Sequence, residues 1–351
     1  MPNTAQAPVL DPRKRPKAKP EPVSPVVDCV PSTSYLKSLS SPGHQFNPQT
    51  PQRHPRFWEA SGDVILQIQS TLFRVHGTTL AKHSRLFASA GKGKGDLDGS
   101  TLHVLALVTA SDFEVLLDAL ENIVQYHTQR PPFQYVAALL RVSTILQFHS
   151  YRQFAIHMLE EAWPSSLAQF SVAIPWPEHA AAAVALARDC SVPQILKRAI
   201  YALLMTPGFS NTTDIEMLSA PELLVLCRAR EYLSKAWIMA AIVPDSNPCP
   251  AALPPPISPT VPRNPHLKQL PASVPTRGCI GVQTHQLLTP VGLANFVHNP
   301  ISGLVAVAAV VVTLKEQGIL CDVCHDRKWH ELMSRREEIW VELDEVLGLA
   351  P

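Results

Sequence analysis

Two short runs of alternating side chains, followed at once by a helical stripe, constrain the fold of this chain more than any other feature of its 351 residues. Every second residue is apolar over Val64–Ile68 and again over Phe73–His76, as in half-buried strands. Only a few residues separate the two runs, so we expect a β-hairpin. Leu80, Ser84 and Phe87 then recur at helical spacing. The sequence therefore predicts an α+β domain that opens with a hairpin and a short helix.

In order and spacing, these residues resemble the opening of a BTB/POZ domain. The family motif combines an Asp-Val opening, an aromatic residue in the hairpin, a His, a Leu-Ala pair, a Ser and a Phe. The chain departs from it at Gly77, where the family often carries an arginine. The resemblance implies a protein–protein interaction module rather than an enzyme. Its motif residues here are Asp63, Phe73, His76, Leu80, Ser84 and Phe87, with Val64 and Ala81 completing the two pairs.

The resemblance continues beyond the hairpin. A third strand is expected around Leu102, and Ser111–Glu114 has the form of a capping box in front of an apolar stripe. The family commonly has a similar helix at that position. The helical stretch Tyr135–Glu161 resembles the closing helical pair of the family. We therefore assign residues 56–165 to a BTB/POZ-like domain.

A homodimer is a further implication of the resemblance. In the family, the first helix and the segment before the hairpin meet a second copy, which here are Thr78–Arg85 and Phe57–Trp58. Such a two-fold interface would bury an apolar patch that a monomer exposes. If relatives pair the charge of Asp63 with the arginine that Gly77 replaces, that pairing is missing here.

Binding to a cullin-type ubiquitin ligase is a narrower hypothesis. In the family, this contact often uses a hydrophobic-x-Glu element after the first helices. The corresponding stretch here, Gly91–Ser100, contains Leu97-Asp98-Gly99 and no glutamate. A role as a substrate adaptor therefore rests on analogy of fold.

The 34 prolines help to divide the rest of the chain. Residues 1–55 are rich in Pro, Ser and basic side chains and predict a disordered tail. Residues 166–243 read as a helical extension, with a second capping box at Ser219–Glu222. Residues 244–275 predict a Pro-rich linker, and residues 276–351 a segment that ends in an amphipathic helix. This arrangement is similar to that of uncharacterised fungal BTB-domain proteins.

Charge and hydropathy indicate neither a nucleic-acid nor a membrane partner. The net charge is +1, and the apolar run Ile301–Leu314 is too short to span a bilayer. The seven scattered cysteines and the lack of a secretory signal predict a cytoplasmic or nuclear protein. The basic cluster Arg13–Lys19 is either a solvated charged tail or a nuclear import signal, so a nuclear regulator is one alternative function.

The run Cys321–His325 is the sharpest local motif. Its Cys-x-x-Cys-His pattern matches c-type haem attachment, which we reject because the sequence shows no export signal. Cys321 and Cys324 also have the spacing of two zinc ligands, with His325 or His330 as a third and Cys279 as a fourth. Because no second Cys-x-x-Cys is present, we expect packed thiols without a metal or cofactor. A zinc-stabilised or metal-dependent protein is the alternative.

A hydrolase is not indicated. The sequence contains no Gly-x-Ser-x-Gly nucleophile elbow, and its histidines are scattered. His76 is explained by packing within the motif better than by a role as a base. We therefore predict a protein that binds other proteins and catalyses no reaction.

Overall fold

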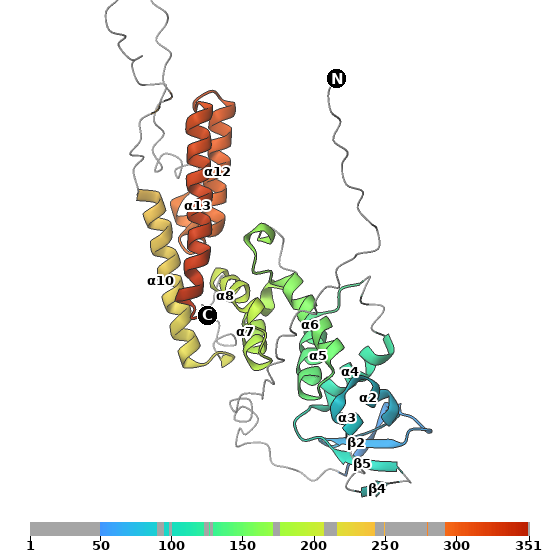
Figure 1. Ribbon diagram of the computed structural model, residues 1–351. Coiled ribbons are helices and arrows are strands. Elements are labelled where there is room, and N and C mark those ends of the chain that lie inside the picture. The colour runs from blue at the N-terminus through green and yellow to red at the C-terminus, as the bar shows by residue number, and fades with distance from the viewer. Residues whose placement is uncertain are drawn as a thin grey trace, which may run out of the picture.

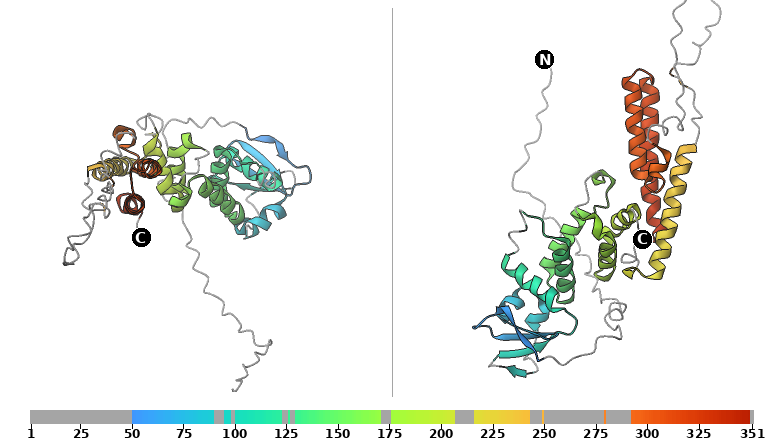
Figure 2. Two further views of the ribbon diagram at one scale, coloured as in Figure 1. Left: turned by 90° about the horizontal axis from the view of Figure 1, so that it is seen from above. Right: turned by 180° about the vertical axis from the view of Figure 1, so that it is seen from behind.

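The computed structural model describes residues 50–89, 95–97, 100–122, 126, 129–170, 176–206, 216–242, 249, 279 and 292–349. The basic cluster at residues 13–19 and, apart from Cys249, the predicted linker at residues 244–275 lie outside these ranges. The sheet lies at one end of the molecule and a group of long helices at the other (Figures 1 and 2).

The predicted hairpin forms the centre of a five-stranded mixed sheet. Its strands are β1 (Gln52–Trp58), β2 (Val64–Ile68), β3 (Thr71–Val75), β4 (Gly95–Leu97) and β5 (Ser100–Val104), in the order β1-β3-β2-β5-β4. β2 and β3 are antiparallel, and β5 is the predicted third strand, parallel to β2. The two-residue turn at Gln69 and Ser70 uses a positive φ of 54° at Gln69.

The boundary predicted for the disordered tail is wrong by a few residues. Regular structure begins at Gln52, because β1 pairs in parallel with β3. Arg56 in this strand also forms ion pairs of 2.8 and 2.9 Å with Asp118 and Glu121. Opposite charges that meet across 60 or more residues are not visible in local composition.

Five helices pack with this sheet to form the N-terminal domain: α2 (Gly77–His83), α3 (Arg85–Ser89), α4 (Ala110–Asn122), α5 (Phe133–Ile145) and α6 (His149–Ala162). Phe73 of β3 is fully buried and meets Phe113 of α4 edge-on, with 5.0 Å between ring centroids. The capping box predicted at Ser111 is displaced. α4 begins at Ala110, and the Thr109 hydroxyl accepts the backbone N–H of Asp112.

Beyond this domain, the α-helices of the described residues are α7 (Ala180–Asp189), α8 (Leu196–Met205), α10 (Ala220–Ile242), α12 (Pro300–Glu316) and α13 (Asp322–Val346). α12 and α13 form an antiparallel hairpin, and α10 packs beside both of them (Figures 1 and 2). One half of the capping box predicted before α10 is present: Glu222 Oε2 accepts the Ser219 backbone N–H at 2.6 Å, and it also accepts the Ser219 hydroxyl. The C-terminal segment therefore packs on the helical extension.

The apolar run Ile301–Leu314 lies within α12. Ile301, Leu304, Val307 and Val311 of this 17-residue helix are buried against the neighbouring helices. Over the part of the chain that the structure describes, no helix combines the length and the apolar character needed to cross a membrane.

Candidate functional site

Asp63, the first residue of the motif, holds the start of α2. Its Oδ1 accepts the backbone N–H of Gly77 at 2.7 Å, and the residue that precedes the helix, His76, provides no side-chain cap. Asp63 therefore satisfies one of the free N–H groups at the helix start from 14 residues away. A Cβ on Gly77 would lie 2.7 Å from Val64 Cγ2. The start of α2 therefore packs too closely against β2 for a larger side chain, such as the arginine that the family often has at this position.

Three of the other motif residues are interior. Phe73, Leu80 and Ser84 are all buried. The Ser84 hydroxyl donates to the Leu146 carbonyl at 2.6 Å and accepts the backbone N–H of Leu86, so it ties α3 to the end of α5. These residues build the domain, and its contacts with other proteins must come from different side chains.

Phe87 and His76 are only partly buried. Phe87 packs edge-on against Phe148, with ring centroids 6.1 Å apart. His76 Nε2 lies 2.9 Å from Glu59 Oε2 and 3.3 Å from Ser61 Oγ. Both contacts use the same ring nitrogen, whereas a catalytic triad needs the acid on one nitrogen and the nucleophile on the other. This Ser-His-Glu group therefore lacks the relay geometry of a hydrolase.

The surface predicted for dimerisation is mostly polar. α2 exposes Thr78, Thr79, Lys82 and His83, while its apolar residue Leu80 faces the core. Phe57 is also buried in its own domain, so of the Phe57–Trp58 pair only the half-buried Trp58 can reach a second copy. The exposed face of α2 can offer hydrogen bonds and charge to a partner, but little apolar area.

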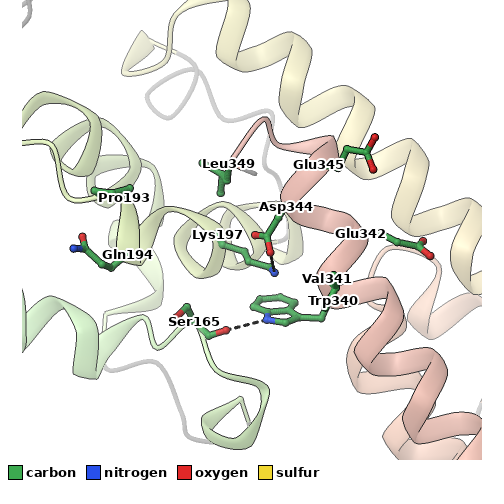
Figure 3. Close-up of a pocket in the computed structure, with 10 residues that line it drawn as sticks. All are labelled: Ser165, Pro193, Gln194, Lys197, Trp340, Val341, Glu342, Asp344, Glu345 and Leu349. Carbon is green, nitrogen blue, oxygen red and sulfur yellow. Dashed lines mark hydrogen bonds and ion pairs between the residues drawn. The ribbon is translucent and has the colours of Figure 1, made fainter. Parts of the chain in front are cut away.

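A pocket of about 810 Å³ lies where the C-terminal helix meets the helical extension (Figure 3). Trp340 and Lys197 form part of its wall, and the Trp340 Nε1–H donates to the Ser165 carbonyl at 2.9 Å. Lys197 Nζ lies 2.7 Å from Asp344 Oδ2 and 4.4 Å from the centroid of the Trp340 ring. These contacts occupy the ammonium of Lys197 and the indole N–H of Trp340, and they fix α13 against α8.

Four cysteines converge near the turn between α12 and α13. The Sγ atoms of Cys249, Cys279, Cys321 and Cys324 all lie within 4.8 Å of one another. The distance from Cys279 Sγ is 2.9 Å to Cys249, 3.3 Å to Cys324 and 3.7 Å to Cys321, and Cys249 to Cys321 measures 3.8 Å. Burial, followed by contact with the other thiols, raises the pKa of Cys279 and Cys324. The structure thus brings three residues of the predicted candidate set together.

The fourth member of this cluster, Cys249, was not among the predicted candidates, and His325 was predicted in its place. His325 lies next to the cluster, but its Nδ1 is 2.7 Å from Asp326 Oδ1. Within the described ranges, the four thiols are the group whose ligand atoms come close enough to share a metal ion. Cys249 stands alone between two prolines, so no spacing pattern connects it with Cys321, 72 residues later.

Comparison with known protein families identifies the N-terminal domain. The model of the BTB/POZ domain matches residues 56–162, which include the hairpin and helices α2 to α6. No curated protein matches the chain. The match agrees with the motif and covers the buried residues Phe73, Leu80 and Ser84. Residues 56–162 of this chain are therefore a BTB/POZ domain, a fold that mediates interactions between proteins.

Proposed function

We propose that this protein is a scaffold that binds other proteins through its BTB/POZ domain and associates with a second copy of itself through the same domain. The match of the family model over residues 56–162 carries this proposal. The fixed geometry of α2 supports it, because Asp63 and Ser84 hold the helix at both ends and leave its outer face exposed.

The second copy would meet the exposed face of α2 together with Trp58. Thr78, Thr79 and Lys82 can all donate hydrogen bonds from this face, and Trp58 supplies an aromatic side chain. With so little apolar area, this association should be reversible and dependent on concentration rather than obligate. The protein would act in the cytoplasm or the nucleus.

Light scattering on the full-length protein over a range of concentrations tests self-association. The expected mass rises from that of one chain, 38.5 kDa, toward twice that value as the concentration increases. A mass that stays at one chain over the whole range would exclude the homodimer. It would leave binding to other proteins as the function of the domain.

The adaptor hypothesis is tested separately. Residues 98 and 99 of the Leu97-Asp98-Gly99 stretch lie outside the described residues, and the stretch has no glutamate. A pull-down of a purified cullin N-terminal domain with the full-length protein decides the question. Retention above that of a control protein would support the adaptor role, and no retention would exclude it while leaving the scaffold proposal intact.

A further inference from the structure

We propose that Cys249, Cys279, Cys321 and Cys324 bind one Zn²⁺ ion as a structural tetrathiolate site. This inference is independent of the interaction surface proposed for the BTB/POZ domain. It goes beyond the sequence motif as well, because the motif supplies only two of the four ligands.

The four sulfurs lie close enough together to share one ion, and two of their separations match a tetrahedral site. Zn²⁺ held by four thiolates at about 2.3 Å places its sulfurs about 3.8 Å apart. The distances of 3.7 and 3.8 Å from Cys321 to Cys279 and Cys249 match that edge length. The two shortest separations, 2.9 Å from Cys279 to Cys249 and 3.3 Å from Cys279 to Cys324, are longer than a disulfide bond of about 2.05 Å and shorter than this edge, so the Cys279 sulfur would move outward as the ion enters.

Packing of apolar thiols does not explain the arrangement. Cys249 and Cys324 are buried, but Cys279 and Cys321 are only half-buried, so they gain little from removal from water. The four residues also come from three separate parts of the chain: one follows α10, one lies before α12, and two stand at the start of α13. Four sulfurs that converge from separate segments on one point are typical of a metal site.

The start of α13 suits two of the ligands. Cys321 is the residue that caps this 25-residue helix, yet its side chain accepts no capping hydrogen bond, and Cys324 follows three residues later. This spacing directs both sulfurs to the same side of the first helical turn. The positive end of the helix dipole lies there, and it would stabilise the negative charge of sulfurs bound to a metal ion.

A charged side chain next to the cluster also favours an anionic site. One Zn²⁺ and four thiolates together carry two negative charges, which need compensation near a protein interior. The Arg327 guanidinium donates from Nη2 to Cys324 Sγ at 3.6 Å. Arginine in contact with a ligand sulfur is the kind of supporting interaction that orients metal ligands and stabilises their charge.

The site would be structural rather than catalytic. Four protein ligands complete the tetrahedral shell and leave no position for a substrate or an activated water. When Zn²⁺ binds, each thiol releases its proton to solvent and the sulfur–metal bond replaces the S–H bond. The ion would join the chain after α10 and the chain before α12 to the α12–α13 turn. It would thereby close the end of the helix group that is remote from the BTB/POZ domain.

The test is metal analysis of the full-length protein, purified without chelator or added metal. We expect about one zinc per chain in the wild-type protein and in Cys227→Ser, a control that changes an exposed cysteine on α10. Cys279→Ser and Cys321→Ser should each lose most of the zinc. Replacement of zinc by Co²⁺ in the wild-type protein should give the absorption of a tetrahedral thiolate complex. This measurement needs no variant and holds even if the substitutions prevent folding.

Several outcomes would overturn the proposal. Absence of zinc in the wild-type protein together with failure to take up Co²⁺ would do so. Detection of iron instead of zinc in the purified protein would show that the site does not select Zn²⁺. A protein mass about 2 Da below that of the fully reduced chain, measured without reductant, would show a disulfide bond. Zinc retained equally by Cys279→Ser and Cys321→Ser would show that the ion binds elsewhere.

Discussion

Lys197 of α8 and Asp344 of α13, separated by 147 residues in the sequence, form an ion pair with 2.7 Å between Nζ and Oδ2 (Figure 3). The Lys197 ammonium also lies over the Trp340 ring, whose Nε1–H donates to the Ser165 carbonyl. Ser165 lies just after the BTB/POZ domain. The C-terminal helix is therefore joined to the chain that leaves this domain.

The two partners of this ion pair should respond differently to substitution. Lys197 is buried and Asp344 is partly exposed, so Asp344→Asn leaves a buried ammonium without its carboxylate. We expect Asp344→Asn to lower the free energy of unfolding by about 1–3 kcal/mol. Lys197→Met removes the charge as well as the pair and should cost less. Urea unfolding measures the free energy of unfolding of both variants, with Glu345→Gln, next to Asp344 on α13, as the control. Equal losses for the two partners would contradict this account.

Ser84 tests whether the motif residues act by holding the BTB/POZ domain together. Ser84→Ala removes a buried hydroxyl that bonds Leu146 and Leu86, so we expect a loss of about 1–3 kcal/mol in stability. Ser89→Ala, in the same short helix α3 as Leu86, changes an exposed hydroxyl that bonds the Arg85 carbonyl and should have little effect. Thermal unfolding followed by circular dichroism compares the two. A Ser84→Ala protein as stable as Ser89→Ala would show that this hydrogen bonding is unimportant.

Glu222 gives a prediction with a defined pH dependence. Burial alone would raise its pKa, but hydrogen bonds from Ser219 and the charge of Arg188 outweigh burial and hold the pKa below its ordinary value of 4.5. A lowered pKa stabilises the folded state above pH 4.5, and this contribution disappears as the pH falls through the folded-state pKa. Glu222→Gln should therefore destabilise the protein by about 1 kcal/mol at pH 7, and the difference should narrow below pH 4.5.

Urea unfolding at several pH values measures this difference. The exposed Glu231→Gln on the same helix serves as the control. A difference between wild type and Glu222→Gln that stays constant, or that grows as the pH falls, would contradict the assigned direction of the pKa shift.

Gly303 allows α12 to approach α10 closely. A Cβ at this position would lie 2.6 Å from Trp237 Cζ3 and 2.8 Å from Phe296 Cβ. Trp237 is fully buried and cannot easily move aside, so Gly303→Ala should cost about 1–3 kcal/mol through overpacking. Val305→Ala, on the exposed side of the same helix, should be nearly neutral. Denaturant unfolding of both variants measures the loss of stability. An unfolding midpoint for Gly303→Ala equal to that of the wild-type protein would contradict the close approach of α12 to α10.

The elements that the sequence predicted well are those whose signal is local. The hairpin at Val64–Ile68 and Thr71–Val75 follows from alternation, and the start of α10 follows from the Ser219–Glu222 capping box. At α4, Thr109 and Ser111 are both acceptable caps two residues apart. A local pattern could not choose between them, and the structure uses Thr109.

The features that the sequence did not predict depend on contacts between distant segments. Asp112 is buried because Arg141, 29 residues away, donates to both of its oxygens at 2.7 and 2.9 Å. Periodicity alone cannot show that a carboxylate has such a partner. Cys249 was missed for the same reason, since its place in the cysteine cluster is set by how α10, α12 and α13 pack.

We propose that the BTB/POZ domain associates with a second copy through the exposed face of α2. The most direct test compares the dimer dissociation constant of the wild-type full-length protein with those of two variants, using sedimentation equilibrium. Thr79→Arg places a bulky charge on that face, whereas Thr313→Arg makes the same change at an exposed position of α12. We predict at least about tenfold weaker association for Thr79→Arg, equivalent to about 1.4 kcal/mol, and no change for Thr313→Arg. Equal association of all three proteins would contradict the claim.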